Sequence, residues 1–453
     1  MTLSPITRRT LLAKAGAASA LAALPALPAW AQGQSIHRQR GGTPIRAGFD
    51  EVSGAVIDLA VGHGTRIVQG RKGHGIAVNG TVPGPLVRLK EGEDVRLNVT
   101  NHLAEDTSIH WHGLLVPFHM DGVPGISFPG IKPGETFAYQ FPVRQAGTYW
   151  YHSHSGLQEQ QGHYGPLIID PAGPEPVAYD RDLIVLLSEF TPLHPHLIMD
   201  RLRKGEGYFN YQQTTLTDRY PLSGKDRRMW AEMRMPPTDI ADVTGSTYTY
   251  LVNGRGPAEG MEYLFRPGER VRLRIINGAA MTFFNVRIPG LAMTVIAADG
   301  QNVAPVEVDE FQIGTAETYD VIIEPTAEAY ALVAESMDRS GMALAMLASR
   351  PGARAVVPPL RDPPLLDMGD MGMNHADMGA GHSMDGMKMR DTLLLPPDVK
   401  IGPGIDMVSM EPVDKLGDPG IGLRDVPHRV LNYRMLRAAE PNRDTRRPSR
   451  LLE

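Results

Sequence analysis

Two short stretches of the sequence carry paired histidines that could bind a metal ion. SIHWHG contains His110 and His112, and YWYHSHSG contains His152 and His154. Because side chains alternate along a β-strand, a His-x-His motif places both imidazoles on one face of the strand. Neutral imidazole nitrogens bind copper, zinc, iron and nickel. Two pairs on neighbouring strands therefore predict four imidazoles that converge on one metal site.

A third His-x-His pair, His194 and His196, is a weaker candidate, because Pro195 between them interrupts strand pairing. The 15 histidines of the chain would give about 0.5 such pairs by chance, so one of the three pairs can be a coincidence. The alternative for any of these residues is a histidine without metal, either buried or on the surface.

A second group of candidate ligands lies in residues 368–389, which are rich in Met, Gly, Asp and His. Thioether sulfur is a soft ligand that suits Cu(I). The irregular, glycine-rich spacing predicts a flexible sequestering loop, and the alternative is a plain disordered linker. The candidate Cu(I) ligands are Met368, Met371, Met373, His375, Met378, His382, Met384, Met387 and Met389.

The elements that must position these residues are predicted to be strands. From residue 51 onward, short apolar runs are separated by Gly, Pro and Asn, and the 48 glycines and 38 prolines favour a turn-rich, all-β fold. VNGTVPGPLVRLKEGEDVRLNVTN (78–101) is echoed by VNGRGPAEGMEYLFRPGERVRLRIIN (252–277). A repeat of domain length predicts two β-domains of one type, at 45–175 and 180–350.

The second copy of this repeat is expected to lack the histidines. Residues 282–290 stand where 107–115 stand in the first copy, with Val286 expected at the position of His110 and Ile288 at that of His112. After the two domains we expect a Pro-rich and then Met/His-rich linker at 351–392. Residues 393–453 are predicted to be a further linker.

The N-terminus and the charge indicate where the protein works. Residues 1–31 contain paired arginines, an Ala/Leu-rich run and an Ala-Trp-Ala stop, which predict a twin-arginine signal peptide and export to the periplasm. The alternative, a membrane anchor, is disfavoured by two prolines in the run. No other segment is apolar enough to serve as an anchor. A net charge of −6 gives no indication of a nucleic-acid partner.

The stretches SIHWHGLLVPFHMDGVPG and GTYWYHSHSGLQEQQG, with their flanks, resemble the first domain of the multicopper oxidases. The signal peptide and the Met/His-rich segment resemble those of the periplasmic copper-resistance branch of that family. The resemblance extends over essentially the whole chain. It implies tandem cupredoxin-like Greek-key β-sandwich domains, copper as the cofactor, and oxidation of Cu(I) or a phenol coupled to reduction of O₂ to water.

The resemblance also implies roles for single residues. His110 is similar to the type 2 copper ligand of the family, and His112, His152 and His154 are similar to type 3 ligands. His119 and His163 match no ligand position. Together the four matched histidines would form half of a trinuclear copper cluster.

The other half of the family's site is not found in the sequence. The chain has no cysteine, so it cannot form a His₂Cys type 1 copper site, and the His-x-x-His-x-His and His-Cys-His motifs are absent. We therefore expect a chain with two domains present and the third missing. O₂ and a reducing substrate are expected as partners only if the third domain is supplied, and a partner chain is one source of that domain.

Three functions remain open from the sequence. The first is a multicopper-type oxidoreductase of periplasmic copper resistance, incomplete in this chain. The second is a non-enzymatic periplasmic protein that sequesters copper ions. The third is a copper-free cupredoxin scaffold, which would have little use for four intact ligands.

Overall fold

The computed structural model describes residues 43–212, 223–233, 236–367, 370 and 414–441. The signal peptide predicted for residues 1–31 lies outside the described residues. So do all nine candidate Cu(I) ligands of the segment 368–389.

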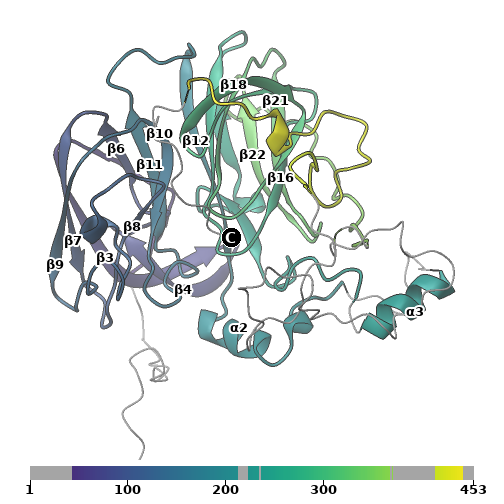
Figure 1. The fold of residues 1–453 in the computed structure, drawn as a ribbon, viewed down its shortest axis with the longest axis horizontal. Helices are drawn as coiled ribbons and strands as arrows, with labels where there is room; N and C mark the ends of the chain where they lie inside the picture. Colours follow the sequence, from purple (N-terminus) through teal and green to yellow (C-terminus); the bar gives the residue numbers. More distant parts are fainter. Residues whose placement is uncertain (1–42, 213–222, 234–235, 368–369, 371–413, 442–453) are drawn as a thin grey trace, which may run out of the picture. The chain divides into compact units, whose positions relative to one another are not determined.

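Residues 46–170 form a sandwich of two β-sheets (Figure 1). Its strands are β1 (Arg46–Ala47), β2 (Glu51–Ser53), β3 (Val56–Val68), β4 (Arg71–Val78), β5 (Thr81–Val82), β6 (Leu86–Lys90), β7 (Asp94–Asn101), β8 (His110–His112), β9 (Thr136–Pro142), β10 (Gly147–His152) and β11 (Tyr164–Asp170). One sheet has the order β1-β5-β4-β3-β7-β9 and the other β2-β6-β11-β10-β8. The short strand β8, which carries the first histidine pair, therefore lies at an edge of its sheet.

Residues 181–348 form a second sandwich of the same kind. Its strands are β12 (Arg181–Phe190), β13 (Thr249–Val252), β14 (Met261–Leu264), β15 (Val271–Asn277), β16 (Phe284–Arg287), β17 (Met293–Ala298), β18 (Gln301–Val308), β19 (Glu310–Ile313), β20 (Thr318–Ile323), β21 (Ala329–Ser336) and β22 (Met342–Ala348). The sheet orders are β13-β12-β15-β20-β17-β18 and β14-β22-β21-β16-β19. The prediction of an all-β fold with paired sandwiches is confirmed.

Helices are few and lie between or after the strands. The described helices are the short 3-10 turns η2 (Phe118–Met120), η3 (Glu206–Tyr208), η4 (Pro257–Glu259) and η8 (Tyr433–Met435), and the α-helices α2 (Pro195–Leu202) and α3 (Gly224–Met233). Among the residues that the structure describes, no helix has the length and apolar character needed to cross a membrane.

Alternation of apolar and polar residues decides which side chains enter the core. In β7, Val95, Leu97 and Val99 are buried, while the residues between them are more exposed. They pack against Trp111 of β8 and Tyr151 of β10 from the other sheet. Burying large side chains of this kind stabilises the fold by about 1.5–3 kcal/mol each.

The two sandwiches repeat each other, and their alignment corrects one prediction. β8 pairs with β10 in the first sandwich, as β16 pairs with β21 in the second. Val286 of β16 lies in the core, as Trp111 does, and Ile288 is also a core residue. The prediction that these residues stand at the histidine positions was therefore wrong by one residue. Because a one-residue shift exchanges the two faces of a strand, the positions that match the histidines are Asn285 and Arg287.

A shared core and a buried charge network join the two sandwiches. Trp150 and Tyr164 of the first sandwich pack against Leu186 and Ile276 of the second. Beside them, the Thr148 hydroxyl donates to Asp320 at 2.7 Å. Two arginines complete the network: Arg272 pairs with Asp320 at 2.6 Å, and Arg274 donates to the Thr148 hydroxyl at 3.0 Å. Because Thr148 belongs to β10, this network also holds the histidine-bearing strand.

The described part of the C-terminal segment, residues 414–441, packs against the second sandwich. Leu423 and Leu431 are buried, and Val430 forms a β-bridge with Glu310 of β19. Glu310 also receives hydrogen bonds from Arg361 and is hydrogen-bonded to His428 at 2.6 Å. The segments before and after the Met-rich stretch thus meet at one buried carboxylate.

We predict that replacing Asp320 with asparagine destabilises the protein by about 3 kcal/mol, because two buried arginines lose a charged partner. Urea unfolding followed by tryptophan fluorescence measures the change. The matched control is Glu328→Gln, which removes a carboxylate from the exposed pair with Arg350 and should cost less than about 1 kcal/mol. Equal losses in the two variants would contradict a buried network.

Candidate metal centre

Strand pairing brings the two histidine motifs together. β8 and β10 run antiparallel, with His110 opposite His152 and Trp111 opposite Tyr151. Trp111 and Tyr151 both point into the core and are fully buried. The alternation of side chains therefore turns His110, His112 and His152 to the other face of the sheet.

His154 joins this group from just beyond the end of β10. Its backbone N–H donates to the Ser108 hydroxyl at 3.0 Å, which holds the chain against the strand that carries His110. The ring centre of His154 then lies 4.7 Å from the ring centre of His110 and 4.8 Å from that of His152. The structure thus brings all four sequence-predicted histidines into one cluster.

The spacing of the ring nitrogens fits a metal ion. Nδ1 of His112 and Nε2 of His152 are 3.3 Å apart. Ligand atoms of His110, His112 and His152 all lie within 4.8 Å of one another. Two nitrogens bound to one ion at about 2.0 Å in a square or tetrahedral arrangement are separated by roughly 2.8–3.3 Å. The donor set therefore fits copper without rearrangement of the strands.

Each of two histidines is oriented by a hydrogen bond at its remote nitrogen. Nδ1 of His110 donates to the backbone carbonyl of Asp121 at 2.7 Å, which leaves Nε2 for a metal. Nδ1 of His152 is 2.9 Å from Oε2 of Glu159, which leaves its Nε2 facing His112. Such partners fix the tautomer of a ligating histidine and raise its basicity.

A glycine allows the loop that supplies the Asp121 carbonyl to lie close to β8. Gly122 has a positive φ of +81°, and a Cβ atom there would lie 1.8 Å from the carbonyl oxygen of Ile109. Any other residue would both strain the backbone and push the loop away from the strand.

Burial favours the neutral form of three of the imidazoles. The pKa of His112 is lowered to about 4, first by burial and then by the neighbouring His152. The pKa of His152 is lowered to about 3 by burial and by His110, and the pKa of His154 is lowered by burial and by His152. A metal binds only the unprotonated nitrogen, so the lowered pKa values of His112 and His152 leave these two rings able to bind copper at neutral and at mildly acidic pH.

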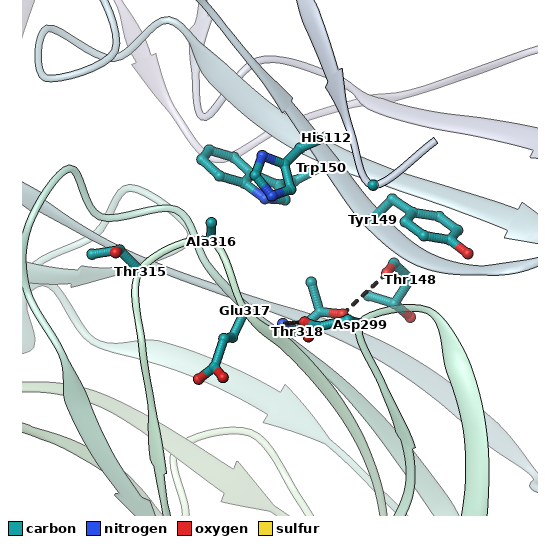
Figure 2. Close-up of a pocket in the computed structure, with 10 residues that line it drawn as sticks. His112, Thr148, Tyr149, Trp150, Asp299, Thr315, Ala316, Glu317 and Thr318 are labelled. Carbon is teal, nitrogen blue, oxygen red and sulfur yellow. Dashed lines mark hydrogen bonds between the residues drawn. The ribbon is translucent and has the colours of Figure 1, made fainter. Parts of the chain in front are cut away.

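One side of the cluster opens into a cavity between the two sandwiches. The cavity, of about 270 Å³, is lined by His112 and Trp150 from the first sandwich and by Asp299 and Glu317 from the second. Figure 2 shows the rings of His112 and Trp150 lying against each other, with Ala316 below them. His112 is therefore the member of the cluster that this cavity reaches.

The remaining histidines named in the sequence lie elsewhere. His119 is exposed on η2, outside the cluster. His163 is fully buried, and its Nδ1 is 3.4 Å from the Thr107 hydroxyl. His194 caps the start of α2, and the ring of the exposed His196 stacks beside it.

The half-buried Glu159 and the buried Glu189 are carboxyls that the sequence did not indicate. Burial raises the pKa of each to about 7, and the Glu159 charge adds to the effect on Glu189. One oxygen of Glu189, on β12, accepts the backbone N–H groups of Ala280 and Met281 at 3.0 and 3.3 Å. No local motif marks Glu189, because its partners come from a distant segment. Glu159 lies only seven residues after its partner His152, but no motif marks it either.

Two segments of the chain match the same protein family. Residues 60–173 and 208–351 each match a family model described as multicopper oxidase. The chain is 47% identical to copper resistance protein A of Escherichia coli, over 89% of this chain and 75% of that protein. A homologue of copper resistance protein A in Pseudomonas syringae pv. tomato is also 47% identical, over 89% of this chain and 74% of that protein.

Solved structures give the same result. The laccase from Botrytis aclada matches with a TM-score of 0.54 and 28% identity, over 70% of this chain and 56% of the laccase chain. The blue copper oxidase from Nitrosomonas europaea matches with a TM-score of 0.51 and 25% identity, over 67% of this chain and 91% of that chain.

The chain belongs to the multicopper oxidases, a family of copper-binding oxidoreductases. The expected family and its copper-resistance branch are confirmed, and so is the cupredoxin-like fold. Copper is the cofactor that the family implies, and the imidazoles of His110, His112 and His152, with His154 beside them, are a donor set that suits it. A non-enzymatic copper-sequestering protein is not favoured by these relatives.

We predict that the stability of the wild-type protein, relative to Glu189→Gln, falls as the pH rises from about 4.5 to about 7. The carboxyl is protonated in the folded protein up to about pH 7, whereas in the unfolded chain it ionises near its ordinary value. Between these pH values the folded state holds a proton that the unfolded state has released. The stabilisation from this proton declines as the pH rises and is lost above about pH 7, which lowers the free energy of unfolding by roughly 3 kcal/mol in total. Urea unfolding of both proteins at several pH values tests this. A constant difference between the two proteins would contradict the raised pKa.

Proposed function

We propose that the chain binds copper at His110, His112, His152 and His154 and contributes this half of the catalytic centre of an exported copper oxidase. The observation that carries the proposal is the convergence of the four imidazoles, with His112 Nδ1 and His152 Nε2 3.3 Å apart. The identity to copper resistance protein A supports the same reaction class.

In this proposal the residues have separate roles. His110 would hold a type 2 ion and the other three histidines would hold type 3 ions, as the resemblance implies. Bound copper would supply the one-electron steps that reduce O₂ to water. The Asp121 carbonyl and Glu159 keep His110 and His152 in the tautomers that leave Nε2 free. Trp150, stacked on both His112 and His152, excludes water from one side of the cluster.

The proposal also requires ligands that face the cluster. The 453 residues contain no cysteine, so they cannot form a His₂Cys electron-entry site. We propose that a further domain or a partner chain carries the facing histidines and this site, with Cu(I) or a phenol as the electron donor. A twin-arginine signal at residues 1–31 would deliver the protein to the periplasm, where the Met-rich segment 368–389 would collect Cu(I).

We predict that His112→Ala/His152→Ala lowers the amount of copper retained by the purified chain by at least one equivalent, because two converging ligands are lost. The copper-to-protein ratio is measured by elemental analysis after copper loading and gel filtration. The matched control is His119→Ala, an exposed histidine outside the cluster, which should retain the wild-type ratio. Equal copper in all three proteins would overturn the assignment of the site.

We also predict that the 453-residue chain, loaded with copper, does not sustain oxidation of Cu(I) or a phenol. Electrons lack an entry site without the cysteine ligand. An oxygen electrode measures the reaction, and adding a polypeptide with the facing ligands should start it. Steady oxygen consumption by the chain alone would contradict the incomplete centre.

A further inference from the structure

A buried arginine lies where the β3–β4 hairpin of the first sandwich meets the second sandwich. Arg66 of β3 is only 3% exposed, and its Nη2 atom is buried without a hydrogen-bond partner. Among the residues that the structure describes, no carboxylate forms an ion pair with its guanidinium. Because an arginine keeps its positive charge inside a protein, this charge is buried without a counter-charge in contact with it.

The hairpin is shaped to hold this side chain in place. A Cβ atom at Gly75 would lie 2.7 Å from the Cγ atom of Arg66. A Cβ atom at Gly73, which pairs with Arg66, would lie 2.8 Å from the ring of Phe190 on β12. The guanidinium carbon is 5.1 Å from the centre of that ring. The two glycines thus let the arginine and the aromatic ring pack closely on the hairpin, which fixes the position of the charge.

Arg66 lines a small cavity to which both sandwiches contribute. The cavity, of about 50 Å³, is also lined by Gln160 and Gln161 from the first sandwich and by Thr191, which follows β12 of the second. None of the described residues that line it is acidic. A cavity needs about 10–15 Å³ to hold one water molecule, so this one has room for an anion of about four or five heavy atoms.

Neutral groups around the guanidinium can donate further hydrogen bonds. Oε1 of Gln160 accepts the Tyr248 hydroxyl at 2.9 Å, which leaves the amide nitrogen of Gln160 as a donor. Oγ1 of Thr191 accepts the backbone N–H of Leu193 at 3.2 Å, which leaves the Thr191 hydroxyl proton for another acceptor. The helix α2 begins at this wall with Pro195, and the start of a helix carries a partial positive charge. The cavity wall therefore combines positive charge with hydrogen-bond donors.

One carboxylate acts on this region from outside the cavity. The charge of Glu105 opposes the lowering of the His74 pKa, of which burial is the largest cause. Glu105 does not line the cavity, and its Oε1 accepts the Gln158 amide at 3.2 Å. It therefore does not supply the acceptor that the buried N–H groups of Arg66 require. A ligand inside the cavity can supply it.

We propose that Arg66, with Gln160 and Thr191, binds a small inorganic oxyanion of the size of bicarbonate or phosphate in this cavity. A guanidinium matches the spacing of oxyanion oxygens, and the hydroxyl and amide donors suit an anion with several acceptor atoms. The bound anion supplies the counter-charge of Arg66 and contacts groups from both sandwiches, so it stabilises their junction. The site shares no residue with the four-histidine cluster.

The test uses the full chain without copper, so its result does not depend on the four-histidine cluster. Calorimetric titration at pH 8 in a buffer free of chloride, with inorganic phosphate and separately with bicarbonate, should show one saturable equivalent of at least one of them. Arg66→Met keeps the apolar stem and removes the charge, so it should weaken binding by more than about tenfold. The matched control is Arg96→Met, which removes an exposed arginine of the same sandwich and should leave binding unchanged.

A second variant keeps the result independent of how well Arg66→Met folds. Gln160→Glu places a carboxylate of the same shape at the cavity wall, where it can pair with Arg66 and repel an anion. It should abolish anion binding, and also the rise of Tm with anion concentration that the wild-type protein shows. A wild-type protein that binds neither oxyanion would overturn the site and assign the cavity to water. So would equal binding by Gln160→Glu, or preferential binding of chloride over both oxyanions.

Discussion

The register between β8 and β10 is the constraint on which the metal centre depends. Tyr151 opposite Trp111 puts two large aromatic rings in the core, and His152 opposite His110 follows from the same pairing. A slip by one residue would bury the imidazoles and expose the aromatic rings. The free energy of aromatic burial, rather than any interaction among histidines, therefore sets the positions of the ligands. The metal site is specified by the hydrophobic core behind it.

The second sandwich uses the same scaffold for another purpose. At the positions that match the two histidines of β8, it has Asn285 and Arg287, and the neighbouring strand β21 presents the buried Glu335. Glu335 is paired with Arg339 and Arg361. On this copy of the sheet, ion pairs cover the outward face and hold the segment that follows the sandwich. The same face of one fold thus serves as a ligand platform in the first copy and as an anchor in the second.

Strand periodicity and motif spacing were enough to predict the all-β fold, the repeat and the convergence of His110, His112, His152 and His154. These features depend on local sequence, because two residues that are two positions apart on a strand lie on the same face of it. The wrong placement of Val286 shows the limit of this reasoning, since a single-residue offset exchanges core and surface. The raised pKa values of Glu159 and Glu189 could not be predicted, because the burial of a side chain depends on the folded structure.

Gly122 has no atom that could bind a metal, yet it determines how one ligand is presented. Its lack of a side chain lets the loop approach β8 closely enough for the Asp121 carbonyl to reach His110. A codon change to any other amino acid would therefore alter the tautomer of an imidazole without touching the imidazole. Natural variation at this position should be as restricted as at the histidines themselves. Replacement of the glycine would have an effect similar to the loss of a ligand.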